Sequence, residues 1–403
     1  MDLEYSPRYK DFQNEVRAFV EAHGHRSPPR SGGGVSRPSQ QMKDWQALLI
    51  EQGYAARIIP REYGGYGAEP DILKTVIIAE ELNKAGLHRG LANQGVTMLV
   101  PTLLELGTEE QRQRWIAPTL RGDIMWCQGY SEPGAGSDLA SLRTSATEDG
   151  DDFIINGHKI WTSSAQVTDM MFVLVRTEPD APKHHGISYL LLPMDSPGIE
   201  IRPLVSMTGE PEFNEVFFTD VRLKRDQIVG RRGEGWQVAN ATLKHERGML
   251  GDPDRTARQL LGLIDCLRTE TVNGEALIEN PVYRDRVLRL QARVKAMQYN
   301  SLRVLTCNLK GEDPGVARLI VKLNATILNN EIAETAIDIL GEAGVLYGDS
   351  AYLRREGMWQ YNYMYSLGLI IGGGTSQIQK NIIAERGLGM PREPKPKLNA
   401  AAR

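Results

Sequence analysis

Cysteine is scarce in this chain. Its 403 residues include only three cysteines, Cys127, Cys266 and Cys307, which are far apart in the sequence. This number and spacing exclude a disulfide framework and match no structural zinc motif, so we expect no bound metal. Unpaired cysteines are typical of proteins from a reducing compartment, and we therefore expect a cytoplasmic location.

Long apolar runs and a strong excess of charge are also missing. The longest apolar runs, such as residues 170–175 and 367–371, are too short to cross a bilayer. The first residues, Met1 to Tyr5, lack the basic start and apolar core of a secretory signal. The net charge of −4 indicates no general affinity for nucleic acid or for an anionic membrane. We therefore expect neither as a partner.

A chain of 403 residues is too long for a single domain of ordinary size. The pattern of apolar residues divides it into three regions. Residues 1–125 are predicted to form an α-helical domain, and residues 126–235 a β-barrel or sandwich. Residues 236–403 are predicted to form a helical bundle. The predicted helices cover residues 7–23, 41–53, 70–84, 109–121, 236–250, 254–272, 281–310, 314–340 and 375–386. The predicted strands include residues 171–175, 187–192, 199–203 and 215–221. The predicted fold class is therefore α+β with several domains.

A hairpin is predicted at residues 153–161. Phe153-Ile154-Ile155 and Ile160-Trp161 flank Asn156-Gly157. This dipeptide tolerates the positive φ angles of a type I′ turn.

Two segments carry the clearest functional pattern. Residues 129–138 read Gly-Tyr-Ser-Glu-Pro-Gly-Ala-Gly-Ser-Asp, and residues 156–163 read Asn-Gly-His-Lys-Ile-Trp-Thr-Ser. The first is rich in small residues and hydroxyls, so its backbone N–H groups can approach a ligand closely. The second carries an indole and two hydroxyls. Taken separately, each could be an ordinary turn or a core tryptophan.

In this order and spacing, the two segments resemble the flavin signature of the acyl-CoA dehydrogenase family. The resemblance covers essentially the whole chain, and it implies an FAD-dependent enzyme with an N-terminal helical domain, a middle β domain and a C-terminal four-helix-bundle-like domain. It places Gln128, Tyr130 and Ser131 along the pyrimidine edge of the flavin. Main-chain donors there would stabilise the charge that the ring gains on reduction.

The same resemblance assigns four further residues near the flavin ring. Gly136 and Ser137 are expected close to the ring and pyrophosphate, with Ser137 also touching the substrate. Trp161 is expected to pack against the isoalloxazine, and Ser163 to hydrogen-bond a flavin heteroatom.

A third segment, Gly372-Gly373-Gly374-Thr375-Ser376-Gln377, precedes a predicted helix. Free N–H groups at a helix N-terminus attract anions. The family uses this Thr-Ser-Gln to hold the ADP portion of FAD, which implies that role for Thr375 and Gln377. The alternative is a simple helix cap.

The catalytic base departs from the commonest family pattern. In many members a glutamate lies two residues before this threonine, but here that residue is Gly373. Other members carry the base in a Glu-Arg pair on a bundle helix, and Glu246-Arg247 matches it. Glu246 also continues an apolar stripe at helical spacing, formed by Trp236, Ala239, Leu243 and Leu250. Glu246 is therefore the predicted base. Burial on this stripe would raise its pKa and make it a stronger base.

The neighbouring residues receive substrate-binding roles. Arg247 would pair with Glu246 or position the substrate, and the Gly373 amide would bind the thioester carbonyl. A buried structural Glu–Arg ion pair is the alternative. Replacing the usual glutamate by glycine also hints at a branched, cyclic or bulky acyl group.

A second departure concerns the assembly. The family's Arg-x-x-Phe-Gly segment, whose arginine reaches the FAD of a neighbouring subunit, is absent from residues 272–278. The segment at 338–344 resembles the family's Gln-x-x-Gly-Gly only loosely. A homotetramer or homodimer is expected from the family, and a heterotetramer with a second acyl-CoA dehydrogenase-like subunit is the alternative, with this chain supplying the base.

The expected partners are an acyl-CoA substrate and an electron-transferring flavoprotein. Two other functions stay open. A flavin monooxygenase or oxidase on the same fold would consume oxygen without an added electron acceptor. A non-enzymatic, CoA-binding subunit would lack FAD until a second chain is present.

Overall fold

The computed structural model describes residues 5–29, 36–249 and 251–394, and the side chains of residues 246–249 lie outside this description. Contacts divide the chain into two compact units, Met1–Glu246 and Arg247–Arg403, which are treated separately below. Helix α6 (Gly235–Met249) runs across this division.

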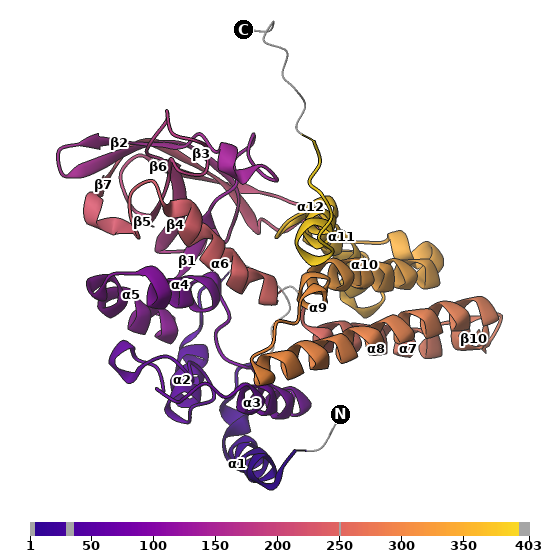
Figure 1. The fold of residues 1–403 in the computed structure, drawn as a ribbon. Helices are drawn as coiled ribbons and strands as arrows, with labels where there is room; N and C mark the ends of the chain where they lie inside the picture. The colour runs from indigo at the N-terminus through magenta and orange to yellow at the C-terminus, as the bar shows by residue number, and fades with distance from the viewer. Residues whose placement is uncertain (1–4, 30–35, 250, 395–403) are drawn as a thin grey trace, which may run out of the picture. The chain divides into compact units, whose positions relative to one another are not determined.

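The first unit begins with a series of helices (Figure 1). They are α1 (Pro7–His23), α2 (Gln40–Glu51), α3 (Ile72–Lys84), α4 (Val100–Leu106) and α5 (Glu109–Arg121). Phe12 and Phe19 of α1 pack with Trp45 of α2 and Ile77 of α3. The sequence predicted four of these helices but missed the helical segment 95–106, because Gly95 and Pro101 interrupt its pattern.

An eight-stranded sheet follows, with the order β6-β7-β3-β2-β4-β5-β8 and with β1 paired to β4. The strands are β1 (Trp126–Gly129), β2 (Ser145–Asp149), β3 (Asp152–Ser163), β4 (Met170–Arg176), β5 (Ile187–Pro193), β6 (Ile199–Leu204), β7 (Phe213–Lys224) and β8 (Ile228–Val229). On β4, Phe172 and Leu174 face the helices, whereas Met171 and Val173 face a second core shared with β3 and β7. The predicted middle β domain is confirmed.

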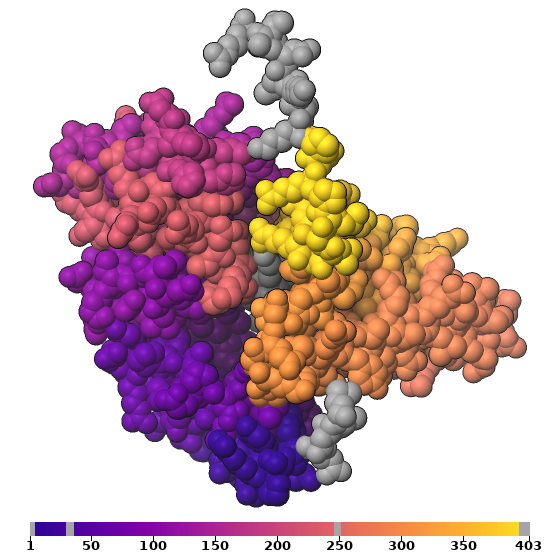
Figure 2. All heavy atoms as spheres, in the orientation of Figure 1, coloured from indigo at the N-terminus to yellow at the C-terminus, as the bar shows by residue number. Residues whose placement is uncertain are grey.

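One core joins helices to strands within the first unit. Residues of α4 and α5 pack with Phe172, Tyr189 and, from α6, Val238 and Ala239. In Figure 2 the purple spheres of the helices adjoin the pink and salmon spheres of later residues in the same unit. The N-terminal half of α6 therefore belongs to the β domain's core.

The predicted hairpin at residues 153–161 is wrong. Asp152–Ser163 is one strand, β3, and the turn lies earlier, between Asp149 and Asp152, which pair with each other. The register against β7 shifts here, because Ile155 pairs with Val221 and Gly157 with Phe218, so the extra residue of this bulge lies on β7, opposite Asn156-Gly157. A Cβ on Gly157 would lie 2.6 Å from the Cα of Thr144. Glycine is needed at position 157 because the backbone of Thr144 approaches closely, and not because the chain turns there.

The second unit is a helical bundle, as predicted. Its elements are α7 (Pro253–Thr269), β9 (Thr271–Val272), β10 (Glu275–Ala276), α8 (Pro281–Lys310), α9 (Val316–Leu319), α10 (Val321–Leu340), α11 (Met358–Ile371) and α12 (Ser376–Ile382). Leu263, Leu290, Ile332 and Trp359 share its core. The sequence missed α11, because its apolar and aromatic residues are spread around the helix and show no helical periodicity. Within the described ranges, no helix has the length and apolar character of a membrane span.

Replacing Gly157 by Ala should lower the free energy of unfolding by about 1–3 kcal/mol, because the added methyl group overlaps the Thr144 backbone. Urea unfolding of the purified protein measures this loss. Gly134→Ala is the control, since a Cβ there meets nothing within 4 Å, and it should change stability by less than about 0.5 kcal/mol. Equal losses in both variants would contradict the close approach of Thr144 to Gly157.

Candidate functional site

The loop after β1 folds back on itself and leaves part of its main chain exposed. Glu132 and Ala135 exchange two backbone hydrogen bonds, with N···O distances of 3.1 and 3.0 Å. Ala135 is buried, whereas Gly136 and Ser137 are exposed. The turn therefore presents small residues and backbone groups at the surface, as a close-fitting ligand requires.

A buried ion pair fixes this loop to strand β3. The Lys159 ammonium, which is fully buried, donates to Glu132 Oε1 at 2.8 Å and to the Tyr130 carbonyl at 3.1 Å. The Glu132 carboxylate also accepts the backbone N–H groups of Thr144 at 2.8 Å and Arg143 at 2.6 Å. Every one of these bonds joins the loop to a neighbouring segment, so the loop has little freedom to move.

The electrostatics of the pair follow from its burial. Burial lowers the pKa of Lys159 to about 8, although the Glu132 carboxylate acts in the opposite direction. Burial alone would raise the pKa of Glu132, but the Lys159 charge and the donated hydrogen bonds hold it below its ordinary value. Both groups are therefore charged at neutral pH.

Trp161 projects from β3 beside the loop. The Ile160 N–H donates to the Ser131 carbonyl at 2.9 Å, which brings the two predicted flavin segments together. The register against β7 shifts between Lys159 and Thr162. Strict alternation would bury Trp161, but this bulge turns it outward, 59% exposed and with φ at +60°. A positive φ at a bulky exposed residue is strained, and such strain is typical of functional sites.

The remaining predicted flavin residues of the first unit lie on these same segments. Gln128, Ser131 and Ser163 are half-buried. The Tyr130 ring is buried against Phe172, with the ring centroids 5.9 Å apart. Tyr130 could therefore meet a cofactor only through its main chain.

The predicted residues of the second unit lie in the connection between α11 and α12. Gly373 and Gly374 have φ angles of +64° and +98°. The Thr375 hydroxyl caps α12 by accepting the Ile378 N–H at 3.3 Å, and Gln377 is exposed. The α-helix has only seven residues and continues as a π-helical turn, Ile383–Gly387. Thr375 thus forms the helix cap that was the alternative to cofactor binding. The assignment of Thr375 and Gln377 to the ADP portion of FAD stays a prediction.

Glu246 and Arg247 lie in the last turn of α6, but their side chains are outside the described residues. The preceding turns are described. Ala239 and Thr242 are fully buried, and Leu243 is packed against the same core. Position 246 follows this face at helical spacing, which keeps its predicted role open.

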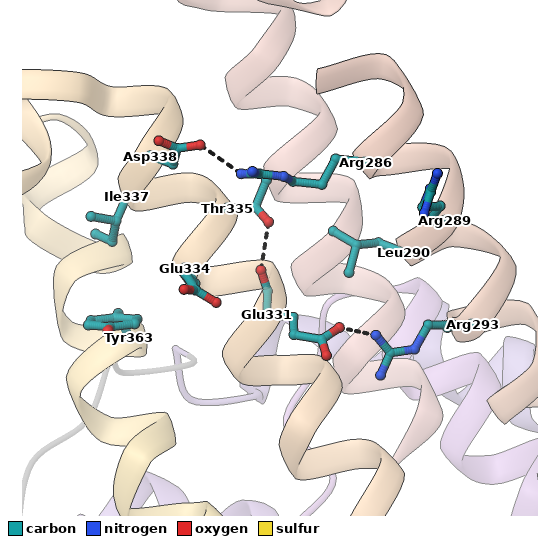
Figure 3. A pocket seen from close by; sticks show the side chains of 10 residues that line it. All are labelled: Arg286, Arg289, Leu290, Arg293, Glu331, Glu334, Thr335, Ile337, Asp338 and Tyr363. Carbon is teal, nitrogen blue, oxygen red and sulfur yellow. Dashed lines mark hydrogen bonds and ion pairs between the residues drawn. The ribbon is translucent and has the colours of Figure 1, made fainter. Parts of the chain in front are cut away.

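A cavity of about 660 Å³ lies between α8, α10 and α11 in the second unit (Figure 3). Arg286 pairs with Asp338 at 2.7 Å, and Arg293 pairs with Glu331 across the gap. Tyr363 of α11 lies on the opposite wall. Because the facing charges neutralise each other and no predicted site residue lines the cavity, we assign it no part in the chemistry.

Sequence reasoning missed four residues that hold the candidate site. They are Glu132, Lys159, Lys322 and Gln379. One signal was available for Lys159, which continues the inward-facing series Phe153, Ile155 and Gly157. A lone lysine in such a series indicates a buried partner. The described residues contain no group of three or more His, Cys, Asp or Glu side chains that could hold a metal.

Comparison with known protein families matches the chain in three parts. The acyl-CoA dehydrogenase N-terminal, middle and C-terminal domain models match residues 6–123, 127–221 and 233–388. The chain belongs to the acyl-CoA dehydrogenase family. Its relatives are named acyl-CoA dehydrogenases, and the chain is accordingly an oxidoreductase that acts on acyl-CoA.

Several relatives match over nearly the full length. Acyl-CoA dehydrogenase IpdE1 of Mycobacterium tuberculosis is 38% identical, over 96% of this chain and 99% of that protein. The structure of the Tcur3481-Tcur3483 steroid ACAD has a TM-score of 0.81 and 30% identity, over 98% and 100% of the two chains. The ChsE4-ChsE5 complex of M. tuberculosis has a TM-score of 0.78 and 29% identity, over 98% and 100%.

Replacing Lys159 by Met should lower the free energy of unfolding by about 3–5 kcal/mol, because the Glu132 carboxylate then stays buried without its cation. Urea unfolding at neutral pH measures the loss. The double variant Glu132→Gln/Lys159→Met should be more stable than Lys159→Met, since it leaves no unpaired charge.

Lys183→Met provides the matched control for this prediction. Lys183 pairs with Asp138 of the same loop, but both side chains are about half exposed, so the loss should be at most about 1 kcal/mol. If Lys159→Met were no more damaging than this control, the buried pair would not anchor the loop.

Proposed function

We propose that this protein is an FAD-dependent dehydrogenase that converts an acyl-CoA thioester to the α,β-enoyl-CoA, with Glu246 as the base. One observation carries the proposal. The two flavin-like segments are joined by the Ile160–Ser131 bond and the Lys159–Glu132 pair, and they present an exposed, strained Trp161 beside an open loop.

The open surface fits a flat aromatic cofactor. An indole that is 59% exposed supplies a stacking face, and no Cβ contact would restrict Gly134 or Gly136. Gln128, Ser131, Gly136, Ser137 and Ser163 would hold the flavin with their polar groups, together with the main chain of Tyr130. Thr375 and Gln377 would hold the ADP portion. When bound, FAD supplies an acceptor for the hydride that leaves the substrate's β-carbon.

The chain's own residues would perform the remaining steps. Glu246 takes the α-proton, and the electron pair of that C–H bond forms the double bond between the α- and β-carbons. The Gly373 N–H binds the thioester oxygen and makes the α-proton more acidic. Ser137 and Arg247 would position the thioester, and Trp161 would exclude water.

The position of Glu246 supports its assignment as base. It follows the buried face formed by Ala239 and Thr242 at helical spacing, and Gly373 cannot act in its place. A carboxylate that is withdrawn from water is a stronger base, since its charged form is disfavoured.

The substrate class is inferred from the space at Gly373 and from the relatives. A glycine where many members carry a glutamate leaves room beside the reacting carbons, and one similar structure is a steroid ACAD. We therefore propose a bulky, ring-bearing acyl group. The electron acceptor would be an electron-transferring flavoprotein, as the family resemblance implies.

Replacing Glu246 by Gln should leave the flavin absorbance intact and slow its bleaching by substrate at least about 10²-fold, because the amide cannot accept the proton. Anaerobic stopped-flow with a panel of straight-chain, branched and steroid acyl-CoA thioesters measures the rate. Glu234→Gln, an exposed residue next to the start of α6, is the matched control and should bleach normally. Undiminished bleaching in Glu246→Gln would remove Glu246 from the mechanism.

A heteromeric assembly is favoured by two observations. The Arg-x-x-Phe-Gly segment is absent from this sequence. The similar structures, Tcur3481-Tcur3483 and ChsE4-ChsE5, are each named for two proteins. We infer that this chain works beside a second acyl-CoA dehydrogenase-like chain. Purified alone, it should carry substoichiometric FAD, and light scattering should not show a tetramer. A homotetramer that contains one FAD per chain would contradict the heteromeric assembly without affecting the role of Glu246.

A further inference from the structure

The connection between α11 and α12 contains three consecutive glycines, Gly372, Gly373 and Gly374. Two of them have positive φ angles, which glycine adopts at little cost. Glycine also loses more conformational freedom on folding than any other residue. A three-glycine segment holds one geometry only where neighbouring groups fix its peptide planes.

A buried lysine fixes one side of this segment. Lys322, in the first turn of α10, is 3% exposed. Its ammonium donates to the Gly374 carbonyl at 2.8 Å and to the Ile370 carbonyl, near the end of α11, at 2.9 Å. A charged group withdrawn from water to this extent needs strong hydrogen bonds. The lysine therefore ties the end of α11 to the last glycine of the segment.

A buried glutamine fixes the peptide between the second and third glycines. Gln379 of α12 is 4% exposed, and its Nε2 donates to the Gly373 carbonyl at 3.1 Å. The amide lies so close to Gly374 that a Cβ there would be 2.8 Å from Nε2. Lys322 and Gln379 thus hold the two successive carbonyls that follow the Gly373 N–H.

We propose that Lys322 and Gln379 are positioning residues, which hold the Gly373 amide in the orientation that binds the thioester carbonyl. This inference rests on the proposed function, because that function makes Gly373 the donor. A donor that is fixed before the substrate arrives needs no reorganisation when charge develops on the oxygen, and this preorganisation is the source of its catalytic effect. Neither residue touches the reacting atoms in this account.

The test measures the thioester carbonyl directly. The probes are 3-thiaoctanoyl-CoA and the 3-thia analogue of the acyl skeleton that the wild type oxidises fastest, both labelled with ¹³C at the carbonyl. Sulfur replaces the β-carbon, so neither can be dehydrogenated. Difference infrared spectroscopy should show a lowered carbonyl frequency on binding to the wild-type holoenzyme. In Lys322→Met and Gln379→Leu this lowering should be largely lost, and kcat should fall about tenfold or more with FAD content unchanged.

A conservative variant distinguishes positioning from a general loss of structure. In Gln379→Glu, the ionised carboxylate cannot donate to the Gly373 carbonyl, whereas the protonated acid can. The frequency shift should therefore return as the pH is lowered, without a change in FAD content. The controls are Lys380→Met and Lys295→Met, which remove exposed charges and should behave as wild type.

The outcomes separate this inference from the proposed function. If the wild type binds the probes without any carbonyl shift, the thioester does not meet a fixed donor, and both the role of Gly373 and this inference fail. If the wild type shows the shift and Lys322→Met and Gln379→Leu retain it with normal kcat, only the positioning role is overturned.

Discussion

The buried pair of Lys159 and Glu132 is the interaction on which the candidate site depends. Each charge is withdrawn from water, and each is compensated by hydrogen bonds to a different part of the chain. Such a pair is stable only in one arrangement, because any shift leaves a buried charge without its partner. The end of β1, the start of β2 and the middle of β3 are thereby held in register around one loop.

The same pair accounts for the position of the exposed tryptophan. Lys159 must point inward to reach Glu132, and regular alternation would then turn Trp161 inward as well. The bulge before Thr162 releases it, at the cost of a strained backbone. Local strain is thus concentrated at the residue for which family resemblance implies contact with the flavin. In the second unit, Lys322 and Gln379 likewise hold the carbonyls of Gly374 and Gly373.

Much of the fold could be predicted from the sequence, since periodic helices and short strands separated by turn residues are local signals. The prediction was wrong at Asn156-Gly157, where a turn dipeptide continues a strand opposite a bulge of β7, and where the glycine lies against Thr144. It missed α11, whose surroundings in the bundle stabilise a helix without an apolar stripe. The flavin residues named by resemblance in the first unit lie on two joined segments. The ion pair that joins these segments was not foreseen. The inward position of Lys159 was a visible signal, but local spacing does not identify its partner, Glu132, which lies 27 residues away in the sequence.

Residues 129–138 and 158–163 are proposed to form one cofactor-binding surface. Hydrogen–deuterium exchange, compared between the FAD-loaded and FAD-stripped protein, tests it most directly. The account predicts that both segments gain protection together when FAD is added, while the exposed surface of α1 is unchanged. If protection appears elsewhere and neither segment responds, the surface around Trp161 is not the flavin site.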